Sequence, residues 1–169
     1  MSETALREQL RASFKNRAIL YYLIFDELRQ EMGEERAQAV LLRAIYRRGT
    51  QIGEPFRKFA PDDLAGLQDA FLKIIPDSGR MFDPQVVRSD AEGLDIQLEA
   101  CPLKEAWQEL GLSEADLVTM CRIAGEIDRG TFEAAGFAFE PDTWQPGRSG
   151  CCHLKIRKKT NGTGPHGDA

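Results

Sequence analysis

The sequence has no surplus of positive charge and no long apolar run. Its 169 residues carry 22 Lys and Arg against 27 Asp and Glu, for a net charge of −5, whereas proteins that bind nucleic acid normally carry a basic surplus on one face. The longest apolar run, residues 18–25, is too short to span a bilayer. These absences predict a chain that binds neither nucleic acid nor membrane.

The first residues also lack the basic segment and apolar core of a secretory signal. The four cysteines are therefore expected to be reduced thiols in a cytoplasm. No two of them have Cys-x-x-Cys spacing, and a zinc site would have to be assembled from distant residues. The sequence accordingly predicts no metal and no other cofactor.

Apolar residues recur at helical spacing through the first 75 residues or so. Three helices are expected, over residues 4–30, from residue 34 onward, and from residue 60 to about 76. The buried stripe of the first helix is Leu10, Phe14, Ala18, Tyr21, Phe25 and Leu28. This half of the chain contains no evident catalytic constellation.

After these helices, the spacing of apolar residues changes to every second residue. Residues 85–88 and 93–100 are predicted to form paired strands, because apolar and polar residues alternate along the second of them. A short helix over residues 103–110 follows, then a long helix to residue 134 that Ser113 should cap. Strands are expected at residues 137–139 and 151–158.

The expected order is three helices, a hairpin, two helices and a second hairpin. Elements in such blocks predict an α+β fold, with helices packed on one face of a small antiparallel sheet. We expect one domain over residues 1–159 and a disordered tail over residues 160–169. The first two helices offer a possible homodimer surface, because their polar faces are not uniformly charged.

An acid lies on the inner face of the long helix. Cys121, Gly125, Asp128 and Phe132 are spaced four, three and four residues apart and so share one face. A buried carboxylate is costly without a partner, and burial raises its pKa. Asp128 is therefore a candidate acid/base or ligand-binding group. The alternative is an acid at the edge of the stripe that pairs with an arginine or caps backbone amides.

The cysteines differ in the chemistry that they suggest. Cys101 precedes a helix N-terminus, where the dipole would stabilise a thiolate, although it could equally close a layer of the core. Alternation along the last strand places Cys152 on the apolar face and puts Cys151 and His153 on the opposite face. Cys121, and also Cys152, are expected to pack as small hydrophobic residues.

Four segments of the chain resemble the L-2-amino-thiazoline-4-carboxylic acid hydrolase family. They are residues 17–21 (RAILY), the pair Cys101-Pro102, residues 125–128 (GEID) and residues 150–154 (GCCHL). The resemblance covers most of the chain, from Ala12 to Lys158. Members of the family are taken to open a five-membered thiazoline ring by adding water at the carbon between sulfur and nitrogen, which gives N-carbamoyl-cysteine.

The resemblance implies a role for each matching residue. Asp128 would be the catalytic acid/base, and Cys101 and Cys152 would line the pocket beside it. Arg17 would bind the substrate carboxylate, with His153 as a second substrate-binding residue. The function implied is hydrolysis of a small cyclic C–N/C–S compound similar to 2-aminothiazoline-4-carboxylate.

Two positions depart from the pattern of that family. Gly125 stands where a Cys precedes the helix acid by three residues, and His153 stands where an acid follows the last Cys. If Gly125 replaces a nucleophile or ligand, the pocket would serve another heterocycle or carry no chemistry.

The order of elements is also similar to the small-ligand domains of the 4-vinyl-reductase and transport-particle (TRAPP) type. These domains bind hydrophobic molecules or dimerise through their helices, which makes a non-catalytic binding or dimerisation module the alternative function. An enzyme should gather Asp128, Cys101 and Cys152 around a polar cavity, whereas a binding module should have an apolar tunnel. A purely structural partner protein would instead expose an apolar helix face and have no pocket.

Overall fold

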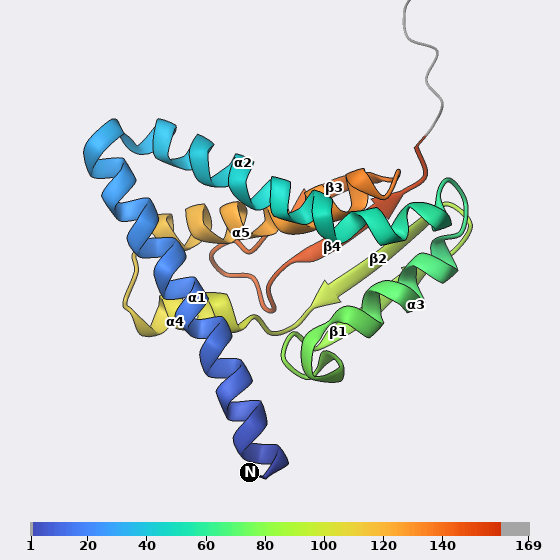
Figure 1. Ribbon diagram of the computed structural model, residues 1–169, viewed down its shortest axis with the longest axis horizontal. Helices are drawn as coiled ribbons and strands as arrows, with labels where there is room; N and C mark the ends of the chain where they lie inside the picture. Colours follow the sequence, from blue (N-terminus) through green and yellow to red (C-terminus); the bar gives the residue numbers. More distant parts are fainter. Residues whose placement is uncertain (1, 160–169) are drawn as a thin grey trace, which may run out of the picture.

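The computed structural model describes residues 2–159, and the tail predicted from residue 160 lies outside the described residues. Helices and strands follow each other in the predicted order (Figure 1). Their bounds are α1 Glu3–Met32, α2 Glu34–Gly53, α3 Leu64–Ile74, β1 Pro84–Ser89, β2 Gly93–Leu98, α4 Pro102–Glu109, α5 Glu114–Ala134, β3 Ala138–Asp142 and β4 His153–Arg157. Two short 3₁₀ helices, η1 (Glu54–Phe59) and η2 (Pro76–Gly79), precede and follow α3.

Helices α3 and α5 begin at side-chain caps that the sequence provides. The Ser113 hydroxyl accepts a hydrogen bond from the Asp116 amide at 3.1 Å, which confirms the predicted start of α5. The Asp63 carboxylate accepts one from the Gly66 amide at 2.8 Å and caps α3. Each cap satisfies an amide that has no partner inside its helix.

The four strands form one antiparallel sheet in the order β1-β2-β4-β3. In the β2–β4 register Ile96 lies opposite Leu154 and Leu94 opposite Ile156, and all four side chains are buried. The residues between them point to the other face, where Arg157 forms an ion pair with Asp95. With its helices on the apolar face, the molecule has the predicted α+β fold.

Each edge strand of the sheet has a feature that limits pairing. The pairing of β1 with β2 shifts register between Val86 and Arg88, which leaves Val87 as the unpaired residue of a bulge. The opposite edge strand, β3, contains Pro141, which has no amide hydrogen to donate.

The buried side chains form two hydrophobic clusters that adjoin along α5. The first cluster lies between α1, α2, α4 and α5 and surrounds Trp107, whose indole N–H donates to the Ala18 carbonyl at 2.8 Å. The second lies between α3, the end of α5 and the inner face of the sheet. No helix within residues 2–159 combines the length and apolar character needed to cross a membrane.

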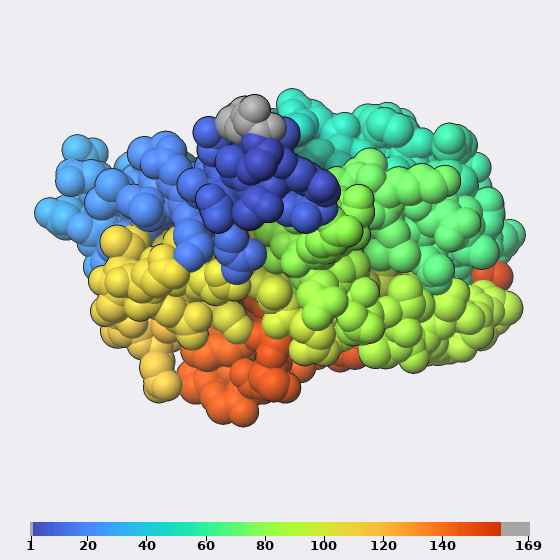
Figure 2. All heavy atoms as spheres, turned by 90° about the horizontal axis from the view of Figure 1, so that it is seen from below, coloured from blue at the N-terminus to red at the C-terminus, as the bar shows by residue number. Residues whose placement is uncertain are grey.

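The N-terminal half of α1 rests on two other elements. Seen from below, α1 lies against the light-green segment after α3 and beside the yellow α4 (Figure 2). Arg7 pairs with Asp77 of η2 at 3.0 Å, and Arg11 pairs with Glu105 of α4. Both pairs are partly exposed, so their main effect is to set the position of α1 rather than to add much stability.

Helices α2 and α5 approach each other more closely than side chains would allow. A Cβ atom at Gly49 would lie 2.2 Å from the Ile127 carbonyl oxygen, and one at Gly130 would lie 2.2 Å from that of Tyr46. The Thr131 hydroxyl, at the same crossing, hydrogen-bonds the Gly49 carbonyl at 3.2 Å. Glycine is required here because the two backbones themselves are in contact.

We expect Gly49→Ala to lower the free energy of unfolding by roughly 1 to 3 kcal/mol, because the added methyl group must push α2 away from α5. In an exposed helix the same change would stabilise by about 0.5 to 1 kcal/mol, so the sign of the effect is diagnostic. Urea unfolding measures it, with Arg47→Ala on the exposed face of α2 as the control. A stabilised Gly49→Ala variant would contradict the close crossing.

Candidate functional site

A cavity of about 260 Å³ lies where the two hydrophobic clusters meet. Its volume is near the lower end of the range for small-molecule sites, roughly 300 to 1,000 Å³. Apolar side chains from α1, α2, α3, η2 and the sheet form most of its wall, including Phe14, Tyr21, Ile45, Phe71, Phe82 and Leu98. The polar groups are few, and they are described next.

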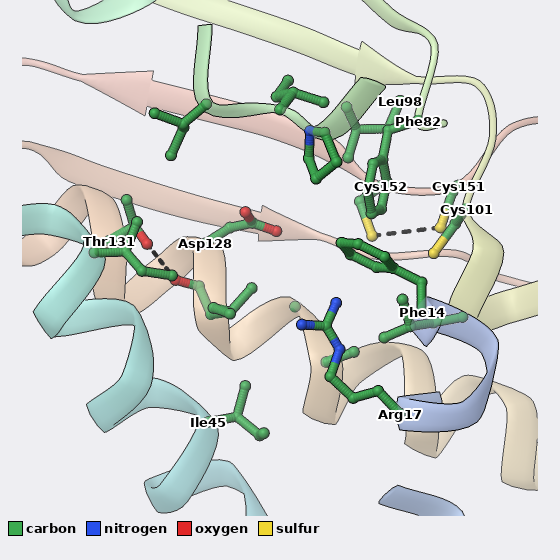
Figure 3. Close-up of a pocket in the computed structure, with 18 of the residues that line it drawn as sticks. Phe14, Arg17, Ile45, Phe82, Leu98, Cys101, Asp128, Thr131, Cys151 and Cys152 are labelled. Carbon is green, nitrogen blue, oxygen red and sulfur yellow. Dashed lines mark hydrogen bonds between the residues drawn. The ribbon is translucent and has the colours of Figure 1, made fainter. Parts of the chain in front are cut away.

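The Asp128 carboxylate points from α5 into this cavity (Figure 3). The side chain is half-buried and turned inward from α5. No residue from 2 to 159 donates a hydrogen bond to it, so the alternative of a paired or capping acid is not observed. Loss of solvent raises the pKa of Asp128 to about 7, and negative charge at Cys151 adds to the rise. A carboxyl group with such a pKa can both give and take a proton near neutrality.

Arg17 reaches the same cavity from α1 (Figure 3). Its guanidinium carbon lies 4.2 Å from the centre of the Phe14 ring, and Phe14 packs edge-on against Phe82 with ring centres 5.8 Å apart. Within the described chain Arg17 forms no ion pair, and its side chain is exposed at the cavity wall. The cation is therefore free to meet a ligand anion at that wall.

The cavity is also lined by Cys101 and Cys152, as predicted, and by Cys151, which was predicted to point outward. The outward prediction is wrong: Cys151 is 3% exposed, and its sulfur lies 3.6 Å from that of Cys152. The strand begins only at His153. Before it, the Cys151 amide donates to the Leu98 carbonyl and the Leu98 amide donates to the Cys152 carbonyl.

Cys151 and Cys152 thus face a single residue of β2, which is the arrangement of a β-bulge. A bulge interrupts the alternation of side chains, so both sulfurs turn toward the cavity. The only sequence signal for it is Gly150, which adopts a φ of +71° that favours glycine. Alternation alone could not have identified Cys151.

The four thiols influence one another strongly. Hydrogen bonds from Cys101, Cys121 and Cys152 lower the pKa of Cys151, whereas donation to Cys151 and burial raise the pKa values of the other three. For Cys101 this outweighs the expected effect of the helix N-terminus. Among the described residues, no three or more His, Cys, Asp or Glu side chains are arranged to hold a metal ion.

His153 does not line the cavity. It lies on the polar face of the sheet, with its Nδ1 atom 3.9 Å from Asp142, while its buried Nε2 atom has no hydrogen-bond partner in the described chain. The structure therefore separates His153 from Asp128, Arg17 and the thiols, and we assign it no contact with a ligand.

Gly125 lines the cavity one turn before Asp128. A Cβ atom at this position would lie 2.8 Å from the Thr143 methyl group. A cysteine here, as in the family pattern, would require Thr143 to move. The thiols that line the cavity are instead Cys101, Cys151 and Cys152.

The raised pKa of Asp128 predicts a pH dependence of stability. The ordinary carboxyl pKa is 3.8, so the folded chain holds this proton more tightly than the unfolded chain. The resulting stabilisation is complete below about pH 4 and is lost as the pH rises through about 7. Asp128→Asn removes the buried charge, so at about pH 8 we expect the variant to be more stable than wild type by roughly 2 to 4 kcal/mol.

Urea unfolding of wild type and Asp128→Asn at about pH 5 and about pH 8 measures this difference. Glu27→Gln, which changes an exposed carboxylate on α1, is the control. If the free energy of unfolding changed equally with pH in both variants, the pKa of Asp128 would not be raised.

Solved structures with a similar fold support the architecture. Subunit 3 of the trafficking protein particle complex from Naegleria fowleri, covalently bound to palmitic acid, matches with a TM-score of 0.56 at 13% identity, over 88% of this chain and 96% of that one. The phenol-responsive sensory domain of the transcription activator PoxR, solved with phenol, matches with a TM-score of 0.51 at 16% identity, over 83% and 73%. At these identities the likeness shows the fold alone.

Among curated proteins, none matches the sequence. The family comparison is more specific: the family described as L-2-amino-thiazoline-4-carboxylic acid hydrolase matches residues 11–156, which include every cavity residue discussed above. This range is most of the chain and agrees with the resemblance seen in the sequence. The chain belongs to the L-2-amino-thiazoline-4-carboxylic acid hydrolase family.

Proposed function

We propose that the chain hydrolyses a small cyclic C–N/C–S compound similar to 2-aminothiazoline-4-carboxylate. The observation that carries this proposal is the Asp128 carboxyl group, which faces the cavity without a protein partner and has a pKa near 7. Opening such a ring requires a proton for the ring nitrogen and removal of a proton from water. One group that titrates near neutrality can perform both transfers.

The shape and charge of the cavity suit a substrate of this kind. Its volume of about 260 Å³ favours a single small ring over a long chain. The apolar wall would contact the ring, the Asp128 carboxyl group would meet its nitrogen atoms, and the Arg17 guanidinium would bind its carboxylate. Cys101 and Cys152 would line the end of the pocket beside the ring sulfur.

The test is ring opening of 2-aminothiazoline-4-carboxylate by the purified chain. We expect Asp128→Asn to lower kcat by roughly 10² to 10⁴-fold, because proton transfer is lost. Glu126→Gln is the matched control, since Glu126 lies on the same helix, pairs with Arg129 and does not line the cavity. Arg17→Met should chiefly raise KM, because its contact with the carboxylate would be similar in ground and transition states.

Turnover by wild type that survives in Asp128→Asn would overturn the role of Asp128. No turnover of this or related rings by wild type would favour the second candidate function, a non-catalytic small-ligand module. That candidate is supported by the largely apolar wall and by the palmitic acid and phenol that accompany the two structural neighbours. Native mass spectrometry of the protein as purified from cells would then reveal the ligand that it carries.

We also infer that the chain forms a homodimer through α1 and α2. Leu20, Leu23 and Ile24 lie on one face of α1, and each is about half exposed. Burying this stripe against a second copy would remove apolar surface from water. Sedimentation should give a dimer for wild type and a monomer for Leu23→Glu, and a monomeric wild type would contradict the inference.

A further inference from the structure

Three of the four cysteines, Cys101, Cys151 and Cys152, line one end of the cavity, and Cys121 lies close to Cys151. Cys101 precedes α4, Cys121 lies on α5, and Cys151 and Cys152 form the bulge before β4. Cys151 is at the centre of this group: its sulfur is 3.6 Å from that of Cys152, and the Cys101 and Cys121 thiols lie near enough to lower its pKa. Figure 3 shows the sulfurs of Cys101, Cys151 and Cys152 close together at the end of the pocket.

The groups around Cys151 stabilise a negative charge on its sulfur, which burial alone would disfavour. The neighbouring thiols of Cys101, Cys121 and Cys152 favour negative charge on the Cys151 sulfur, and the Lys104 ammonium adds a favourable electrostatic interaction. Lys104 is held nearby because it donates to the carbonyl of Gly150, the residue before Cys151. Together these contacts lower the pKa of Cys151, and a thiolate is the nucleophilic form of cysteine.

We propose that Cys151 is the nucleophile of the reaction and bonds to the substrate carbon that lies between sulfur and nitrogen. The inference rests on the proposed function and adds a covalent intermediate to it. It is carried by three observations: Cys151 lines the same cavity as Asp128, its sulfur contacts that of Cys152 at 3.6 Å, and it is 3% exposed. A substrate in the cavity can therefore meet a Cys151 sulfur that bulk solvent scarcely reaches.

The ionisation of the Cys151 thiol affects that of the Asp128 carboxyl group. Negative charge at Cys151 is one of the causes that raise the pKa of Asp128. A thiolate at Cys151 therefore favours the protonated form of Asp128, and these are the two forms that ring opening needs. Two nearby groups whose pKa values are pushed apart are typical of an assigned base or nucleophile and an assigned acid.

The first half of the reaction opens the ring. The Cys151 thiolate forms a bond to the carbon, and the electron pair of the C=N bond moves to the ring nitrogen, which takes the proton of Asp128. The tetrahedral adduct then collapses: the exocyclic amine re-forms a C=N bond and the ring sulfur leaves as a thiolate. An isothiouronium group joined to Cys151 remains.

The second half releases the enzyme. Water attacks the same carbon and gives a proton to the Asp128 carboxylate. The bond from carbon to Cys151 breaks, which restores the Cys151 thiolate, and the remaining hydroxyl proton passes to the thiolate of the substrate as the urea carbonyl forms. The sum is one substrate and one water converted to the carbamoylated cysteine, with no oxidation or reduction.

The test looks for the covalent intermediate in the unaltered protein. Wild-type chain in excess over 2-aminothiazoline-4-carboxylate is quenched with acid during a single turnover, digested and measured by mass spectrometry. We expect an adduct with the mass of the substrate on Cys151. In Cys152→Ala the adduct should still be found on Cys151. This result would show that the substrate bonds to the sulfur of Cys151 and not to that of Cys152.

Steady-state kinetics provides the second measurement. Cys151→Ser should lower kcat by about 10³-fold or more, because the hydroxyl is far less ionised than the thiol, and far-ultraviolet circular dichroism checks that it folds. Wild-type turnover without any adduct, together with an active Cys151→Ser variant, would overturn the nucleophile and leave the proposed function standing. No wild-type turnover at all would overturn both.

Discussion

The contact between the backbones of α2 and α5 determines the position of the site. Gly49 and Gly130 let the two helices touch at a separation that no other residue permits. Asp128 lies two residues before Gly130, so its direction is set by this crossing. A methyl group on either glycine would separate the helices and move the carboxylate relative to Arg17 on α1. The positions of the charged side chains in the cavity thus depend on the absence of a side chain at each of the two glycines.

The cavity lies at the junction of the two hydrophobic clusters. The helical cluster and the sheet cluster adjoin along α5, and side chains from both line the space between them. Filling that space with larger apolar residues would strengthen packing, but it would also bury the Asp128 carboxylate without solvent or ligand. The open cavity between the two clusters leaves the Asp128 carboxylate room for solvent or a ligand, even though its pKa is raised.

Much of this could be predicted from the sequence, because much of it is local. Helical spacing placed Asp128 on the inner face of α5, and alternation in β2 placed Leu94, Ile96 and Leu98 inward. Periodicity failed at Cys151, where a bulge interrupts it, and the outward direction assigned there was wrong. The convergence of four thiols from three separate elements depends on tertiary packing, which no spacing in the sequence encodes.

The irregular sheet edges, finally, limit what the molecule can pair with. A regular edge strand offers unpaired amides and carbonyls to any other extended chain. On one side Val87 interrupts the ladder, and on the other Pro141 supplies no donor. Without this interruption, the exposed valines of β1, Val86 and Val87, would favour pairing of that edge with another chain. The sheet has four strands, and neither of its edge strands offers another chain a full row of pairing groups.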